Sequence, residues 1–282
     1  MILNGMAPTL RPMLPADVEA ATELLLGHGW GVRRDWLGFA AAQAACLPVI
    51  AEDGGRIVAT GVGTANGRVG WIGSIFVDPE HRGLGLGRAI TQAIIDGLEE
   101  AGCRTFSLVA TTEGRRLYER MGFTVHTTYR ILEIAGLPSG SASGLIRPFE
   151  AGDLDAMAAL DRVGTGEDRR HAMTAFANPE SAKVVVDSDG AVAGFVIRAP
   201  WGGGATIARS IDDAVRILTA RRLVSGPDGR VRVGLLAENR AGHDRLIELG
   251  MRPSWNAPRM IRGEPLDWQP NWIWGQFNHA MG

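Results

Sequence analysis

The sequence predicts an α/β protein built from two tandem units. Strand-type and helix-type segments alternate along the chain, landmarks of the first half return in the second, and a Gly/Ser-rich stretch lies between the halves. A length of 282 residues also suits two domains of about 140 residues better than one compact core. We expect a first unit over residues 1–138, a linker over 139–144 and a second unit over 145–282.

The first unit is expected to open with a strand, two helices and a β-hairpin. Pro15-Ala16-Asp17 starts a run of apolar residues at helical spacing, which predicts a helix. Asp53-Gly54-Gly55 is a turn signal between two apolar runs, which predicts the hairpin. In order, the expected elements are a strand at 9–13, a helix from Pro15, an Ala-rich helix at 36–45, and strands at 48–51 and 57–63.

A central strand and four further elements complete this unit. Residues 69–77 are continuously apolar, which predicts a strand covered on both faces. Ile90, Ile94 and Leu98 share one face of the following helix, and Gly102 is a natural stop for it. The expected elements are this helix at 88–102, a strand at 106–110, a helix opened by Thr111 and ending at Gly122, and a strand at 123–134.

A glycine-rich loop joins the strand at 69–77 to the helix after it. Glycines at 83, 85 and 87 remove three Cβ atoms where the chain must turn, so backbone N–H groups can converge on one anion at the helix start. The spacing is neither that of a Walker loop nor that of a dinucleotide-binding fingerprint. The loop therefore predicts a phosphate site of another kind.

The pattern Val77, Pro79 and then Arg82-x-x-Gly85-x-Gly87 resembles the acyl-CoA loop of the GNAT superfamily of N-acyltransferases. The order of elements over residues 8–134 is similar to that of the GNAT fold as well, which implies a mixed, mostly antiparallel central sheet flanked by helices in each unit. The resemblance implies acetyl-CoA as co-substrate and a primary amine, of a small molecule, as acceptor. The residues it assigns to binding acetyl-CoA are Ile75, Phe76, Val77, Arg82, Gly83, Leu84, Gly85, Leu86, Gly87, Arg88 and Thr111.

The same resemblance assigns catalysis to Tyr118 in the run Leu-Tyr-Glu-Arg-Met-Gly-Phe, as the proton donor to the CoA sulfur. A phenol with a pKa of about 10 is close enough to a thiolate of about 8.5 for near-balanced transfer. The N–H of Ile75 or Val77 is expected to polarise the thioester carbonyl. A general base is not identified, and the candidates left open are Glu52, His126, Asp35, His28 and ordered water.

One position departs from the family pattern. The family usually has Asn seven positions before this tyrosine, where the chain has Thr111. A hydroxyl can make one of the hydrogen bonds of an amide, so we expect reduced contact with the ligand rather than lost binding. The second half retains Asn239 at the equivalent place.

The second half repeats the architecture of the first without its chemistry. Ile146-Arg147-Pro148 echoes Leu10-Arg11-Pro12 at an offset of 136 (146 minus 10), and Gly250 echoes Gly122 at an offset of 128 (250 minus 122). This half has no Arg-x-x-Gly-x-Gly, and Leu246 stands where the first half has Tyr118. We expect a degenerate GNAT-like unit that shapes the acceptor site. Tryptophans at 268, 272 and 274 are expected either to close its core or to line the acceptor pocket.

Composition excludes several classes of protein. A formal net charge of -2 argues against a nucleic-acid partner, and the two cysteines lack the spacing of a metal site. Residues 1–7 contain no basic leader and no later run is apolar enough to span a membrane, so we expect a cytoplasmic protein with no membrane partner. The oligomeric state and any preference for longer acyl chains stay open.

Two other functions fit the same residues. A non-catalytic protein that responds to acyl-CoA would keep the glycine loop without turnover, although an intact Tyr118 argues against it. A protein or peptide N-acetyltransferase would use the Trp-rich end of the chain as a docking surface. A small-molecule acceptor is favoured because a second unit tends to enclose the site.

Overall fold

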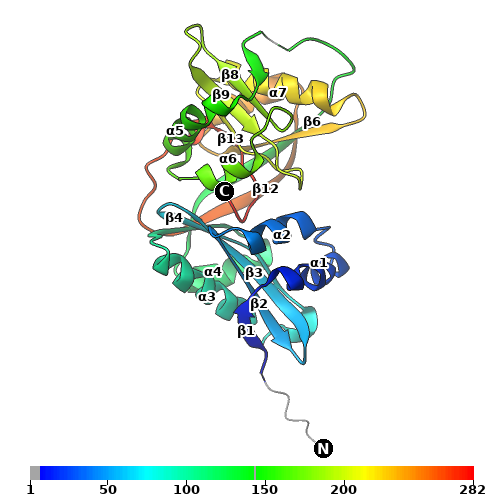
Figure 1. Ribbon diagram of the computed structural model, residues 1–282, viewed down its shortest axis with the longest axis vertical. Helices are drawn as coiled ribbons and strands as arrows, with labels where there is room; N and C mark the ends of the chain where they lie inside the picture. The colour runs from blue at the N-terminus through cyan, green and yellow to red at the C-terminus, as the bar shows by residue number, and fades with distance from the viewer. Residues whose placement is uncertain (1–6, 143) are drawn as a thin grey trace, which may run out of the picture. The chain divides into compact units, whose positions relative to one another are not determined.

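The computed structural model describes residues 7–142 and 144–282 (Figure 1). These residues form two compact units: unit 1 runs through Leu108 and includes 279–281, and unit 2 comprises 109–278 with Gly282. The boundary between the units lies before the predicted one at 138 because the strand at 124–135 pairs with strands from the second half. The predictions made on residues 1–6 and 143 lie outside the described residues.

Unit 1 is built on a mixed sheet with the strand order β1-β2-β3-β4-β5. The first four strands are antiparallel neighbours. The last pair is parallel and runs from Val69 opposite Thr105 to Ile72 opposite Leu108. The strands are β1 (Thr9–Pro12), β2 (Cys46–Asp53), β3 (Arg56–Asn66), β4 (Val69–Val77) and β5 (Thr105–Val109).

Helices cover both faces of this sheet (Figure 1). α3 (Leu86–Glu100) packs on one face through Ile90, Ile94 and Leu98, which are fully buried. It begins two residues before the predicted start, so Leu86, Gly87 and Arg88 form its first turn instead of the end of the loop. The other helical elements are η1 (Pro15–Asp17), α1 (Val18–Gly27), α2 (Arg34–Ala42) and η2 (Pro79–His81).

Unit 2 contains two antiparallel sets of strands, in the orders β12-β6-β11 and β13-β10-β9-β8-β7. The strands are β6 (Thr124–Ala135), β7 (Ile146–Pro148), β8 (Ala182–Val186), β9 (Val192–Ile197), β10 (Thr206–Ala208), β11 (Arg230–Leu236), β12 (Arg252–Gly263) and β13 (Ile273–Gly275). The helical elements are α4 (Thr112–Arg120), η3 (Ala151–Asp153), α5 (Leu154–Thr165), α6 (Arg170–Phe176), α7 (Ile211–Ser225), α8 (Arg240–Glu248) and η4 (Pro270–Trp272).

The core of unit 2 lies under α7. Ile217 and Leu218 of this helix pack with Val185, Leu235 and other buried apolar side chains in one cluster. Trp274 belongs to this cluster and is 3% exposed. This tryptophan therefore closes the core of unit 2, which was one of the two roles expected for it.

The repeat is visible at the level of single side chains. Arg11 donates to both carboxylate oxygens of Asp17 over 2.7 and 2.9 Å, and Arg147 does the same to Asp153 over 2.7 and 2.7 Å. In both places the Asp also accepts a backbone N–H three residues earlier. The Arg partner holds the pKa of each Asp below its ordinary value. The same Arg–Asp pair therefore starts the first helical segment of both repeats.

In the part of the chain that the structure describes, no helix has the length and apolar character needed to cross a membrane.

Candidate functional site

A bulge in β4 marks the start of the candidate site in unit 1. The register between β3 and β4 slips between Thr60 and Val62, which leaves Ser74 and Ile75 opposite Gly61. Ser74 has φ +53°, a left-handed conformation that costs free energy in a residue with a side chain. Two side chains hold it: Thr60 Oγ1 donates to Ser74 O over 2.9 Å and Trp36 Nε1 donates to Ser74 Oγ over 3.0 Å.

The N–H of Val77 faces away from β3. Asp78 N–H donates to Val58 O over 2.8 Å, so these two residues form a hydrogen-bonded pair. Bonded and non-bonded pairs alternate in an antiparallel ladder, so the neighbouring pair of Ala59 and Val77 is of the non-bonded type. Pairing of β4 with β5 ends at Ile72, five residues earlier. Val77 therefore offers its donor on the side where β4 has parted from β5.

The loop after β4 is shaped by one capped turn and two glycines. Asp78 accepts the Glu80 N–H over 3.0 Å and starts η2, while Arg56 binds its other oxygen over 2.8 Å. Gly83 and Gly85 have φ +80° and +79°, a conformation that residues with a Cβ rarely adopt. The third glycine of the motif, Gly87, lies inside the first turn of α3.

The N-terminus of α3 has no cap from its own side chains. Gly85 is its N-cap residue, no side chain accepts the first N–H groups, and the first turn carries no acidic residue. Leu86 is buried, so its side chain belongs to the core and only its backbone belongs to the site. Leu84 is exposed, as are Arg82 and Arg88. Free N–H groups, the helix dipole and two arginines favour an anion here.

Phe76 serves a different purpose from its neighbours. Its side chain is buried against an aromatic cluster, with ring centroids 5.0 Å from His28 and 5.5 Å from Trp30. These two residues follow α1, so the cluster fixes the α1–α2 connection against β4. Of the predicted binding residues on β4, Ile75 and Val77 are half-buried and Phe76 packs in this cluster.

Two predicted site residues, Thr111 and Tyr118, belong to unit 2. Thr111 is the N-cap of α4 and its Oγ1 accepts the Gly114 N–H over 3.0 Å, so this hydroxyl has a structural task. Tyr118 is 8% exposed and packs edge-on against Phe123 with centroids 6.1 Å apart. Burial raises the pKa of Tyr118 to about 12. The pKa of about 10 expected from the sequence is therefore corrected: the phenol is a weaker acid and stays protonated at neutral pH.

The candidates for a general base differ in what they contact. Glu52 binds Arg11 over 2.7 Å, and His28 Nδ1 lies 2.8 Å from Leu24 O. Asp35 is exposed in the first turn of α2. In unit 2, His126 stacks on Trp268 with centroids 5.1 Å apart. None of these contacts singles out a base.

The helix of the second repeat that corresponds to α3 has a filled N-terminus. Ser210 caps α7: its Oγ accepts the Asp213 N–H over 3.1 Å and donates to the Asp213 carboxylate over 2.6 Å. Asp212 adds a second carboxylate to the first turn. The retained Asn239 caps α8 in the same way, through the Gly242 N–H, and binds Asn271 O over 2.9 Å.

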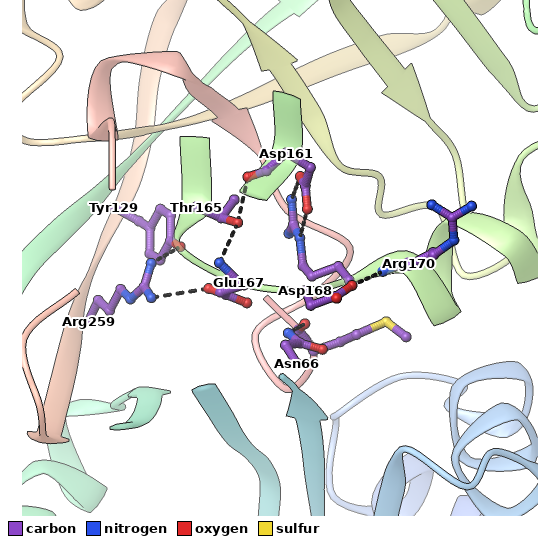
Figure 2. A network of polar contacts seen from close by, with 10 residues as sticks. Asn66, Tyr129, Asp161, Thr165, Glu167, Asp168, Arg170 and Arg259 are labelled. Carbon is purple, nitrogen blue, oxygen red and sulfur yellow. Dashed lines mark hydrogen bonds and ion pairs between the residues drawn. The ribbon is translucent and has the colours of Figure 1, made fainter. Parts of the chain in front are cut away.

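A buried network of charged side chains in unit 2 was missed by sequence reasoning (Figure 2). Arg169 makes two bonds of 3.0 and 2.5 Å to Asp161, and Arg259 lies 3.4 Å from Glu167, with all four side chains at most 2% exposed. Burial alone would lower the pKa of Arg169, but the Asp161 carboxylate raises it above its ordinary value. The partners lie 8 and 92 residues apart, so no local motif marks them.

One cavity of unit 1 lies apart from the predicted site. A cavity of about 650 Å³ in unit 1 is lined by β1, β2, the end of α2 and two residues of α3, but by none of the predicted acetyl-CoA-binding residues. Among the described residues, no group of three or more His, Cys, Asp or Glu side chains is placed to hold a metal ion. The candidate site is therefore described by its backbone N–H groups and the charges around them.

Comparison with known proteins agrees with the sequence motifs. Residues 15–123 match the acetyltransferase (GNAT) family and residues 157–275 match an acetyltransferase (GNAT) domain. The chain is 27% identical over 223 residues to the uncharacterized N-acetyltransferase YitH of Bacillus subtilis, covering 77% of this chain and 78% of YitH. It is 31% identical over 133 residues to the aminoglycoside N(6')-acetyltransferase type 1 of Stenotrophomonas maltophilia, covering 42% of this chain and 86% of that protein.

A solved structure shares the fold of the whole chain. A candidate acetyltransferase from Pyrococcus horikoshii superposes with a TM-score of 0.83 at 17% identity, covering 100% of this chain and 98% of the other. With two matching segments in one chain, the predicted fold of two tandem units, each a mixed sheet flanked by helices, is confirmed.

Proposed function

The chain belongs to the GNAT family of N-acetyltransferases, and on that premise we propose that it moves an acetyl group from acetyl-CoA to the primary amine of a small molecule. GNAT acetyltransferases use acetyl-CoA, so the donor follows from the family. The observation that carries the proposal is the uncapped start of α3 directly after the bulged strand β4. This start supplies a site for the CoA phosphates, and β4 supplies a donor for the thioester.

The residues of the loop have distinct tasks in this proposal. The N–H groups from Gly83 to Arg88 bind the pyrophosphate with the help of the helix dipole. Arg82 and Arg88 add positive charge on the exposed side. Arg82 Nε also donates to Val77 O over 3.3 Å, which ties the loop to the end of β4. Phosphate binding therefore fixes the thioester relative to the backbone of this strand.

The reaction is a direct transfer. The neutral amine attacks the acetyl carbon, the carbonyl oxygen takes negative charge and accepts the N–H of Ile75 or Val77, and the carbon–sulfur bond then breaks. The products are an acetamide and CoA, and the amine loses one proton to solvent. Tyr118 gives its phenolic proton to the leaving sulfur and regains one from water. Because the pKa of Tyr118 is about 12, the donor is protonated before each turnover at neutral pH.

The acceptor class rests on a relative. The aminoglycoside N(6')-acetyltransferase is named for a small amine, and the alignment spans most of that protein. We propose that residues 1–138 carry the chemistry with a small amine as acceptor. The repeat over 145–282 has neither an open helix start nor a tyrosine at position 246, so we assign it the shaping of the acceptor site.

The test is release of free CoA thiol from acetyl-CoA in the presence of amines. A panel would contain aminoglycosides, amino sugars, simple alkylamines and one lysine peptide, each with an amine-free blank. We expect release that depends on at least one small amine and exceeds release with the peptide. Peptide-dependent release alone would replace the small acceptor by a protein. Binding of acetyl-CoA without release from any amine would support the non-catalytic alternative.

A further inference from the structure

Residues 279–281 lie in unit 1 although they follow the last strand of unit 2 in the sequence. Thr64 Oγ1 of β3 donates to Ala280 O over 2.8 Å, and Asn66 Nδ2 donates to Met281 O over 2.8 Å. Ala280 and Met281 are 4% and 0% exposed. Side chains of β3 therefore hold the backbone of this short segment as if it were part of the unit.

The segment covers β4 immediately before the bulge. A Cβ on Gly73 would lie 2.7 Å from the α-carbon of Ala280 and 2.8 Å from His279 O, so the two backbones meet at this glycine. A Cβ on Gly70 would instead meet Leu98 of α3 at 2.8 Å, so the segment and α3 lie on opposite faces of the strand. Ser74, the first bulged residue, follows Gly73 directly.

Backbone hydrogen bonds close the chain around the segment. Phe277 N–H donates to Gly282 O over 2.8 Å and Gly282 N–H donates to Asn278 O over 3.2 Å, which closes residues 277–282 into a tight turn. Ala280 and Met281 are buried and His279 is half-buried, so the tip of this turn packs closely on β3 and β4. The segment therefore lies beside the start of the bulge, next to the part of β4 that carries Ile75 and Val77.

We propose that residues 279–281 act as a water-excluding cover on β4, which reserves the bound acetyl group for the amine. The inference rests on the proposed function, since it concerns the same thioester. The competing reaction is hydrolysis: a water oxygen bonds to the acetyl carbon, the carbon–sulfur bond breaks, and a water proton passes to sulfur, giving acetic acid and CoA. Excluding water suppresses this loss of acetyl-CoA when no acceptor is bound.

Two variants loosen the cover by different routes. Thr64→Val keeps the shape of the side chain and removes the bond to Ala280 O. Gly73→Ala introduces a Cβ that collides with backbone atoms of the segment and must displace it. Gly70→Ala is the matched control for crowding, because the same strand receives a Cβ whose nearest atoms are those of Leu98 on the opposite face. Thr219→Val controls for loss of one Thr bond, here to Val215 O within α7.

The measurement is the ratio of amine-free thiol release to amine-dependent thiol release, with acetyl-CoA affinity measured by calorimetry. Both test variants are expected to raise this ratio about tenfold while acetyl-CoA affinity stays within about twofold, because the phosphate loop is untouched. The two controls are expected to keep the wild-type ratio. Equal ratios in folded Thr64→Val, Gly73→Ala and wild-type protein would overturn the proposal.

Hydrogen exchange separates failure of this inference from failure of the proposed function. If wild-type protein binds acetyl-CoA and no amine supports release, the proposed function fails, yet the cover is still tested by amide exchange at residues 74–77. Exchange there is expected to be about tenfold faster in Thr64→Val than in Thr219→Val. Unchanged exchange at 74–77 in both test variants would show that residues 279–281 do not shield β4.

Discussion

The helices α3 and α7 occupy corresponding positions in the two repeats but differ in how their N-termini are capped. Both have 15 residues and both follow a strand of their own sheet. Position by position, Gly85, Leu86, Gly87 and Arg88 of α3 correspond to Ser210, Ile211, Asp212 and Asp213 of α7. In α3 the N-cap glycine makes no side-chain cap and the first turn has no acidic residue, whereas α7 has a capping serine and two carboxylates at the same place.

The two repeats keep the same supporting contacts although their helix starts differ. The Arg–Asp pair at the first helical segment and the N-caps of α4 and α8 are preserved in both repeats. At the start of the helix, Asp212 and Asp213 stand where the first repeat has Gly87 and Arg88. The cap stabilises α7, and the negative charge of its carboxylates disfavours phosphate at the same place.

The largest effect is expected when the first turn of α3 receives the two aspartates found in the first turn of α7. Gly87→Asp combined with Arg88→Asp places two carboxylates in the first turn, where they repel the pyrophosphate and bind its N–H groups. We expect acetyl-CoA affinity to fall at least about 100-fold, which is about 2.7 kcal/mol. Gln92→Glu, which adds a charge farther along the exposed side of α3, is the control. A double variant that binds within about threefold of wild type would contradict the assignment of the loop.

The second contrast is Tyr118 in the first repeat against Leu246 in the second. Tyr118→Phe removes the proton donor and is expected to lower kcat at least about tenfold with little change in the KM for acetyl-CoA, because the loop is intact. Since the pKa of Tyr118 is about 12, its loss of a proton is expected to leave wild-type kcat unaffected up to about pH 10. Tyr129→Phe removes the other tyrosine hydroxyl, also from a buried position, and serves as control. Equal kcat values for the two variants would remove Tyr118 from the mechanism.

A third prediction concerns His279, which lies in unit 1. Burial, with Arg33 adding repulsion, lowers the pKa of His279 to about 4. The unfolded chain therefore takes up a proton before the folded one as pH falls, so the contribution of His279 to stability is complete above about pH 6.5 and is lost toward pH 4. The urea midpoint of unfolding should fall between pH 7.5 and pH 5 in the wild type. This fall should be smaller in His279→Gln, which lacks the titrating group. A difference in His279→Gln as large as that of the wild type would count against a lowered pKa of His279.

The smallest expected effect concerns the caps themselves. Ser210→Ala should cost about 1 kcal/mol of unfolding free energy and leave acetyl-CoA binding unchanged. Gly85→Ala should cost a similar amount, because φ is +79° at this position, and should also weaken acetyl-CoA binding. Chemical denaturation and calorimetry on both variants measure the two quantities. Weaker acetyl-CoA binding in Ser210→Ala would mean that α7 takes part in ligand binding.

Elements with strong local signals were predicted well from the sequence. The strand at 69–77 and the helix cap at Thr111 have the expected bounds, because an apolar run and a capping residue are read locally. The hairpin strands are longer than expected, Cys46–Asp53 and Arg56–Asn66, because their ladder continues past the apolar residues. Other features depend on residues that are distant in the sequence and so have no local signal. The bulge at Ser74 is an example, because hydrogen bonds from the side chains of Trp36 and Thr60 hold it.

The backbone conformation of the glycine loop was predicted from the sequence, whereas the burial of side chains near it was not. The glycine loop is where the motif places it, since left-handed turns at Gly83 and Gly85 are a property of glycine itself. The roles of Leu86 and Phe76 as core residues and the raised pKa of Tyr118 depend on burial, which is a property of the folded chain. The contact of Thr64 with Ala280 joins residues 216 positions apart, beyond the reach of any local pattern.

The most direct test of the account is the stoichiometry of acetyl-CoA binding to the full chain, measured by isothermal titration calorimetry on wild-type protein and on the Gly87→Asp/Arg88→Asp variant. One open helix start and one filled helix start predict a single site per chain in the wild type and no measurable site in the variant. Two sites in the wild type, or one site that survives in the variant, would contradict the claim that the start of α3 is where the CoA phosphates bind.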